Sequence, residues 1–186
     1  ILIDSFWPLC RAALLYTIPL TIVSFACGTV LAFITAIFRL SGVRILEAVA
    51  KFYIWIIRGT PLLVQQFVIF YGLPSLGIVL SPFVSGVLGL SLCQGAYNSE
   101  IVRAAILAVP SGQWEAAKAL GMNQAQTYLR IVIPQAARTA VPSLGNQFIG
   151  LTKDTSLAGM LTIPELLQSG QQIPAVVYEA LALYLE

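Results

Sequence analysis

Four polar residues inside apolar stretches are the ones in this sequence best suited to do chemistry. Lys153 and Asp154 are adjacent and lie well inside the stretch that begins at Ala140, and Asn98 and Glu100 lie at the end of another. Ionisable groups in such surroundings are costly, so they usually pair with each other or face a polar cavity. Two interpretations follow. Either Lys153 forms a structural ion pair with Glu100 or Asp154, or these side chains line the path of a polar solute.

The rest of the sequence offers little for enzymatic chemistry. It has no histidine, so the commonest general base and metal ligand is absent, along with every Ser-His or Cys-His nucleophile pair. Cys10, Cys27 and Cys93 have no CxxC spacing and lie in or beside apolar runs, which is typical of small buried side chains. The segment 89–93 lacks the final glycine of a GxSxG turn, and no lysine follows a glycine as in a Walker loop. We therefore expect no catalytic residue, no metal site and no ATP site in this chain.

Membrane helices are the elements that must position the polar residues. The sequence has 186 residues, of which 58% are hydrophobic and 10% charged, whereas about 25% of residues are charged in soluble proteins. So few charges cannot cover the surface of a compact fold, so lipid must cover much of it. The net charge of +2 is too small for a protein that neutralises nucleic-acid phosphates. We expect a single transmembrane domain over residues 1–186 and no nucleic-acid partner.

Uncharged stretches predict an all-α membrane protein with five spans. The spans lie at about 12–38, 52–73, 82–101, 140–161 and 176–186. The last is shorter than the roughly 20 residues that a span needs, and it ends with the sequence. Basic residues favour the cytoplasmic side, and most of them follow the first span or lie in the loop 103–138: Arg39, Arg44, Lys51, Arg58, Arg103, Lys118, Arg130 and Arg138. Both connections are therefore expected in the cytoplasm, with the N-terminus outside.

The long cytoplasmic loop should have structure of its own. We expect two short helices. Ser111 can N-cap the first, and Gly121 is placed to end it in a left-handed conformation. Asn123 and Gln126 form a capping-box pair for the second helix, which should end at Pro134. These features alone are equally compatible with a helix pair that lies on the lipid headgroups.

The second span should be kinked where it leaves the cytoplasmic face. Pro61 removes a helical hydrogen bond and restricts the residue before it, so the kink is expected there. Arg58 can extend to the membrane surface, and we assign it a topological role. Leu62 and Leu63 follow the kink, where they either narrow a path between the spans or simply belong to an apolar helix.

The cytoplasmic loop carries a family resemblance. Glu115, Ala116 and Ala117, followed by Gly121 and by an I-x-I-P ending at Pro134, resemble the EAA loop of ABC importer permeases, whose usual ending is I-x-L-P. Further segments, in chain order, resemble permeases for polar amino acids of the histidine, glutamine, arginine and cystine type. They are RGTPLLVQ at 58–65, YGLP at 71–74, AYNSEIVRAAI at 96–106, GQWEAAKALGM at 112–122, and KDTSL with TIPEL within 153–166. The resemblance covers nearly the whole chain.

The resemblance implies a type I ABC importer permease of the bacterial cytoplasmic (inner) membrane. Its loop would be the coupling helix, in which Glu115, Ala116, Ala117 and Gly121 dock onto a cytoplasmic ATPase and drive alternating access. The implied partners are two ATP-binding subunits, a second permease chain of the same or a homologous sequence, an extracytoplasmic amino-acid binding protein and membrane lipid. ATP and Mg would be bound by the ATPase, so this chain itself would hold no cofactor.

An amino acid as the solute assigns roles to the intramembrane polar residues. Asp154 or Glu100 would bind the ammonium group. Asn98 and Asp154 are the strongest candidates, because the Asn98 amide avoids the full cost of a buried charge and Asp154 has the required negative charge. The donors for a carboxylate or a polar side chain are Lys153, Asn98, Thr155 and Ser156. The sequence is compatible with a cystine-type or a basic amino-acid system.

Two other functions fit the apolar composition less well. A secondary carrier often has inverted repeats, and the sequence shows no matching halves. A membrane scaffold protein would leave the EAA segment and the Lys153-Asp154 pair without a role.

Overall fold

The computed structural model describes the backbone of residues 2–177 and the side chains of residues 7–171, and every regular element in that part of the chain is helical. The α-helices are α1 (Leu2–Ala12), α2 (Ile18–Leu40), α3 (Arg44–Arg58), α4 (Leu62–Phe67), α5 (Pro82–Leu107), α6 (Ser111–Ala119), α7 (Gln124–Thr127), α8 (Ile133–Asp154) and α9 (Leu166–Val177). The π-helical turns are η1 (Ala13–Thr17), η2 (Val68–Gly72) and η4 (Tyr128–Val132), and the 3-10 turns are η3 (Leu73–Leu76) and η5 (Thr155–Leu161).

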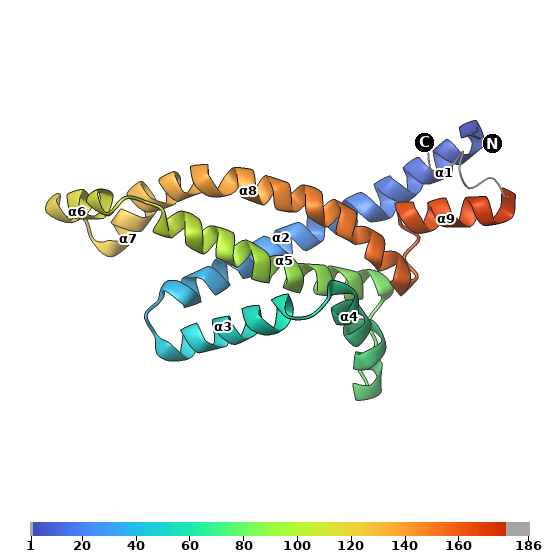
Figure 1. Ribbon diagram of the computed structural model, residues 1–186, viewed down its shortest axis with the longest axis horizontal. Coiled ribbons are helices and arrows are strands. Elements are labelled where there is room, and N and C mark those ends of the chain that lie inside the picture. Colours follow the sequence, from blue (N-terminus) through green and yellow to red (C-terminus); the bar gives the residue numbers. More distant parts are fainter. Residues whose placement is uncertain (1, 178–186) are drawn as a thin grey trace.

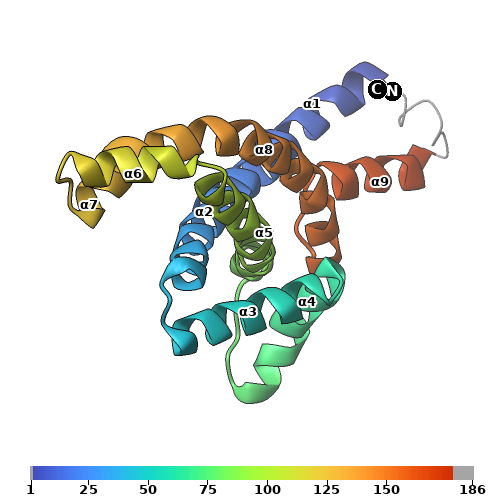
Figure 2. The ribbon, with the colours of Figure 1, turned by 60° about the vertical axis from the view of Figure 1, so that its left-hand side comes forward.

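The helices form an elongated bundle with a distinct element at each end. Helices α2, α5 and α8 run along its length, α6 and α7 project from one end, and α1 and α9 lie together at the other (Figure 1). Figure 2 shows α3 and α4 on the opposite side of α5 from α8. The N-terminal helix and the α6–α7 element therefore lie at opposite ends of the bundle.

The first predicted span is one long helix in the structure. Residues Trp7–Leu40 form a helix of 34 residues that is long and apolar enough to cross a membrane. The second predicted span is a pair of helical segments, Arg44–Arg58 and Leu62–Leu76, with a bend of 103° between them. The two segments are long and apolar enough to cross a membrane only when they are counted as one span. Helices α5 and α8 overlap the third and fourth predicted spans, and the fifth lies almost wholly outside the described residues. The five-span count therefore stays a prediction.

Small residues bring α2 and α5 into close contact. A Cβ added to Gly28 of α2 would lie 2.7 Å from the Cβ of Gln94 and 3.1 Å from the carbonyl oxygen of Ser91, both on α5. The Ser91 hydroxyl also donates to the carbonyl oxygen of Ser24, at 3.3 Å. Close approach through small residues is the usual way in which helices associate in lipid, because apolar side chains gain little by exchanging lipid contacts for protein contacts. The α2–α5 pair is thus the scaffold on which the cavity residues of α5 are held.

Two hydrophobic clusters hold the ends of the bundle. Leu20, Leu90 and Leu151 join α2, α5 and α8 near the end where η5 lies. Ala105, Val109, Val132, Ala136 and Ala140 join α5 to η4 and α8 near the α6–α7 end. The cavity described below lies along α5 between these two clusters.

Local helix signals in the loop 103–138 are partly confirmed. Gly121 has a φ of +71° and follows α6, as a left-handed terminator should. Asn123 and Gln126 form a full capping box at the start of α7. The prediction for Ser111 is wrong, because Pro110 is the N-cap and Ser111 is already the first helical residue. Pro110 has an extended backbone, with φ −56° and ψ 138°, but its side chain has no polar atom, so no side-chain cap is formed.

The prediction that the second loop helix ends at Pro134 is also wrong. The helix passes from α7 through the π-helical turn η4 into α8, and Pro134 is among the first residues of α8. Proline is disfavoured in a helix because its ring meets the carbonyl one turn earlier and because it lacks an N–H group. The wider π turn directly before Pro134 relieves this conflict, so one continuous helix runs from the loop into the predicted fourth span.

Candidate functional site

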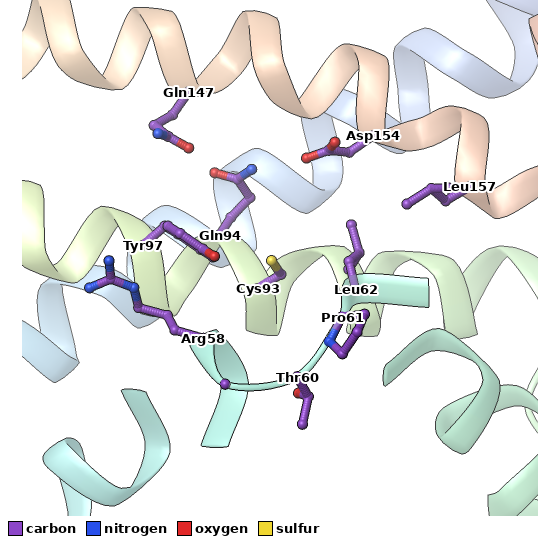
Figure 3. Close-up of a pocket in the computed structure, with 11 residues that line it drawn as sticks. Arg58, Thr60, Pro61, Leu62, Cys93, Gln94, Tyr97, Gln147, Asp154 and Leu157 are labelled. Carbon is purple, nitrogen blue, oxygen red and sulfur yellow. The ribbon is translucent and has the colours of Figure 1, made fainter. Parts of the chain in front are cut away.

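A cavity of about 550 Å³ lies where the α3–α4 bend approaches α5 and α8. Figure 3 shows side chains from these three regions directed toward it. Its polar lining residues are Arg58, Thr60, Gln94, Tyr97, Gln147 and Asp154. One cation, one carboxylate and two amides in a cavity of this size suit a small polar molecule that carries both charges.

The wall formed by residues 58–62 depends on the bend in the chain. Helix α3 ends at Arg58, and Pro61 is extended, with φ −62° and ψ 139°, before α4 begins at Leu62. The kink predicted at Pro61 is therefore confirmed, and the bend of 103° is large enough to break the helix. The chain is not helical between Arg58 and Leu62, and residues 58–62 all line the cavity.

Arg58 lies on the cavity wall, where the sequence indicated only a topological role. Its guanidinium carbon is 5.0 Å from the centre of the Tyr97 ring. A guanidinium stacked on an aromatic face is attracted by the negative face of the ring and keeps its N–H groups free for a second partner. Arg58 is thus the cationic group of the cavity and is held in place by α5.

Asp154 supplies the opposite charge. It is the last residue of α8, is half-buried and lines the cavity. Its carboxylate points toward the region of Gln94 and Gln147 (Figure 3). Among the described residues it has no ion-pair partner. A carboxylate in this position is available to a solute ammonium group.

Of the residues predicted for the substrate path, Leu62 and Asp154 line the cavity and the others do not. Glu100 accepts hydrogen bonds from Arg39 at 2.8 Å and from Arg103 at 2.9 Å, so the predicted ion pair of Lys153 with Glu100 is replaced by a pair of arginines. Lys153 is exposed and does not line the cavity, and the structure gives it no ion pair with Asp154 among the described residues.

Asn98 is fully buried and both of its amide atoms lack a hydrogen-bond partner. Thr155 is also fully buried, and its hydroxyl donates to the carbonyl oxygen of Thr152 at 2.7 Å. Ser156 and Leu63 are half-buried, outside the cavity lining. Each of these positions lies on the same helix or turn as a residue that lines the cavity, and the sequence alone does not tell which face meets the cavity.

Sequence reasoning missed five polar lining residues: Arg58, Thr60, Gln94, Tyr97 and Gln147. Gln94 and Gln147 carry a usable signal, because an amide inside an apolar helix needs a polar partner or a cavity. No sequence signal places Arg58 over Tyr97, because that contact joins two helices far apart in the chain.

The EAA segment lies at the far end of the bundle from α1 (Figure 1). Glu115, Ala116 and Gly121 are exposed, whereas Ala117 is buried with 2% of its surface accessible. Behind them, the Trp114 ring packs edge-to-face on the Tyr128 ring with centroids 5.1 Å apart. The segment is thus a short exposed helix fixed to the bundle by aromatic packing.

A long apolar helix, a broken second helix and a polar cavity with both charges favour a membrane-embedded transport subunit. The model of the family described as "Binding-protein-dependent transport system inner membrane component" matches residues 28–178. The chain belongs to this family.

Characterised relatives narrow the class. The chain is 50% identical to the "L-cystine transport system permease protein TcyB" of Bacillus subtilis (strain 168) over 98% of this chain and 79% of the relative. It is 43% identical to the "Arginine transport system permease protein ArgU" of Corynebacterium glutamicum over 84% of this chain and 53% of the relative. A solved structure, "Crystal structure of an amino acid ABC transporter with histidines", matches with a TM-score of 0.91 and 33% identity over 98% of this chain and 85% of that one. The chain is therefore the permease component of an amino-acid ABC transporter.

Proposed function

We propose that this permease moves a polar amino acid through the cavity between the α3–α4 bend, α5 and α8. The observation that carries the proposal is the pair of opposite charges in the cavity, Arg58 and Asp154, on different helices. A zwitterion brings an ammonium and a carboxylate group, and each needs a partner that lipid does not supply. Asp154 would bind the ammonium group and Arg58 the carboxylate, with Gln94 and Gln147 as neutral hydrogen-bonding groups.

The names of the relatives support a polar amino acid as the class of solute. TcyB is named for L-cystine and ArgU for arginine, so the same fold carries side chains of different charge. Both substrates share the zwitterionic main-chain groups. The opposite charges of the cavity suit those shared groups, which leaves discrimination between side chains to other contacts.

Energy for transport would come from a separate ATPase docked at the EAA segment. Exposed Ala116 gives α6 a face with little bulk, which allows close approach of another protein, and Gly121 permits the sharp turn after the helix. Docking of two ATP-binding subunits on a permease pair, with ATP and Mg in those subunits, would switch the cavity between the two sides of the membrane. An extracytoplasmic binding protein would deliver the amino acid.

The proposed orientation has the α6–α7 end in the cytoplasm and the N-terminus outside. The opposite locations of α1 and α6 in the bundle support it (Figure 1). The basic residues near the α6–α7 end agree with the bias of Lys and Arg toward the cytoplasm.

Asp154→Asn tests the substrate role, with Lys153→Gln as its matched control. Both changes replace one charge by an amide at adjacent positions, but only Asp154 lines the cavity. In vesicles that contain the permease, its ATPase and its binding protein, we expect Asp154→Asn to lower amino-acid uptake about 10- to 100-fold, the value of one charged hydrogen bond. Lys153→Gln should keep uptake near that of the parent. Equal uptake by the two variants would contradict the role of Asp154.

Glu115→Arg and Ala116→Leu test the docking role separately. Both residues are exposed on helix α6, so either change should leave the fold intact. We expect substrate-stimulated ATP hydrolysis to fall and the ATPase to co-purify less well. ATP hydrolysis that stays in step with uptake in both variants would exclude this segment as the docking site.

A further inference from the structure

The broken helix between α3 and α4 is closed by one side chain, Gln65. Its Nε2 group donates to the carbonyl oxygen of Ile57 at 2.7 Å, to that of Thr60 at 3.0 Å and to the Thr60 hydroxyl at 3.0 Å. The Thr60 hydroxyl in turn donates to the carbonyl oxygen of Ile56 at 2.9 Å. The last carbonyl groups of a helix have no partner within the helix. Here the first turn of α4 supplies the missing donor to the end of α3.

The amide is used as a donor and not as an acceptor. An amide nitrogen has two hydrogens, so the three contacts of Gln65 share them. Its Oε1 atom is buried without a partner, although an unpaired buried acceptor is costly. The fold retains that cost at a position where an apolar side chain would avoid it. The useful feature of Gln65 is therefore the pair of N–H groups that reach back across the bend.

The bend that Gln65 closes is also the wall of the cavity. Arg58, Thr60 and Leu62 line the cavity from this segment, and the bend turns the chain by 103°. The turn is tight, because a Cβ added to Gly59 would lie 2.8 Å from the carbonyl oxygen of Trp55. A segment without regular structure keeps a fixed position only where side chains hold it.

We propose that Gln65 is a positioning residue: its amide fixes the α3–α4 bend and thereby sets how closely Arg58 and Leu62 approach the cavity. Gln65 does not line the cavity and acts through the segment 58–62. Its effect on transport rests on the proposed function, whereas its effect on the shape of the cavity does not. The two are therefore measured separately.

The neighbouring Gln66 provides a matched control. It is fully buried on the same helix, and neither of its amide atoms has a hydrogen-bond partner in the structure. Gln65→Met and Gln66→Met are the same chemical change at adjacent positions. The first removes the donor that closes the bend, and the second removes only unpaired polar atoms. Gln65→Glu is a further variant that keeps the shape of the side chain and replaces its N–H donors with acceptors.

Cys93 reports on the cavity directly, because it is a lining residue whose sulfur faces the cavity (Figure 3). Cys10→Ser and Cys27→Ser leave it as the single thiol of the described residues. In the assembled transporter, the rate of Cys93 modification by a water-soluble maleimide measures access past the bend. We expect Gln65→Met and Gln65→Glu to raise this rate about tenfold, the equivalent of one or two hydrogen bonds. Gln66→Met should modify at the rate of the parent.

Equal rates in Gln65→Met and Gln66→Met would overturn the proposal, and so would an increase in both. Protection of Cys93 by an amino acid tests the proposed function in the same preparation. Where the amino acid protects the thiol, Gln65→Met should raise the amino-acid concentration that gives half-maximal stimulation of ATP hydrolysis. It should leave the maximal rate of hydrolysis unchanged. A general loss of structure would instead lower the maximal rate. If the amino acid did not protect Cys93 in the parent, the cavity would be refuted as a substrate site. The Cys93 modification rates of the Gln65 and Gln66 variants would still test the role of Gln65.

Discussion

Gly28 is a position at which a single methyl group should force α2 and α5 apart. In Gly28→Ala the new Cβ would lie 2.7 Å from the Cβ of Gln94 and 3.1 Å from the carbonyl oxygen of Ser91. Carbon atoms in contact prefer a separation of about 3.5–4.0 Å, so α2 and α5 must move apart by about 1 Å at this point. Rotation of a side chain gives no relief, because a Cβ and a carbonyl oxygen are both fixed to the backbone.

The expected cost follows from two opposing contributions. Overpacking of a filled helix interface costs about 1–3 kcal/mol, and alanine in place of glycine in a helix gains up to about 1 kcal/mol. Gly145→Ala is the matched control, since no atom lies within 4 Å of a Cβ added in α8 at that position. Gly145→Ala should therefore gain the helix propensity of alanine without the cost of overpacking. The two variants should therefore differ by about 1–3 kcal/mol in the free energy of unfolding.

Thermal unfolding of the purified protein in detergent measures this difference. For a chain of this length we expect Gly28→Ala to unfold on the order of 5 °C below Gly145→Ala. Gln94 lines the cavity and lies at the same contact, so Gly28→Ala should also weaken amino-acid binding. Equal midpoints for the two variants would show that the α2–α5 contact is looser than the structure indicates, and the reasoning from Gly28 would then fail.

Two further predictions concern the ends of the bundle. Glu100→Gln removes the carboxylate that joins Arg39 of α2 to α5. Because this ion pair is partly exposed, we expect a coupling energy of only about 1 kcal/mol in a double-mutant cycle with Arg39→Gln. Additive effects of the two substitutions on stability would count against the pair. Glu165 accepts two backbone N–H groups at the start of α9, so Glu165→Ala should cost about 1 kcal/mol locally and speed hydrogen exchange in α9. Burial raises the pKa of the Glu165 carboxyl above its usual value, although the two backbone N–H groups act in the opposite direction. Its ionisation is therefore less favourable in the folded protein, so the protection of α9 should weaken as the pH rises through that raised pKa, and Glu165→Gln should remove this dependence.

Features that depend on neighbours in the sequence were predictable. The left-handed Gly121, the capping box of Asn123 and Gln126 and the kink at Pro61 all follow from local backbone chemistry. There are two exceptions. Ser111 is not the N-cap of α6, because Pro110 takes that position. Pro134 does not end a helix, because a π turn upstream accommodates it and the helix continues. No residue pattern announces that turn in advance, so a rule based on proline alone gave the wrong helix end.

The cavity was harder to predict because its members meet through tertiary packing. Asp154 was expected, since a carboxylate in an apolar helix needs a reason to be there. Asn98 satisfied the same argument equally well, yet it is buried without partners while Gln94, one turn earlier on α5, lines the cavity. The difference depends on which face of α5 meets α2, and that is fixed by contacts such as the one at Gly28.

The distribution of the charges favours a zwitterion over an ion of single charge. Glu100 is engaged by two arginines, which leaves Asp154 as the anionic group of the cavity and Arg58 as the cationic one. If these two were in direct contact they would neutralise each other, and the cavity would have little affinity for either end of an amino acid. Their separation on α3 and α8 leaves each to be satisfied by water or by the solute (Figure 3). A bound zwitterion compensates both without adding net charge, whereas an ion of single charge would leave one of the two uncompensated in a medium where that is costly.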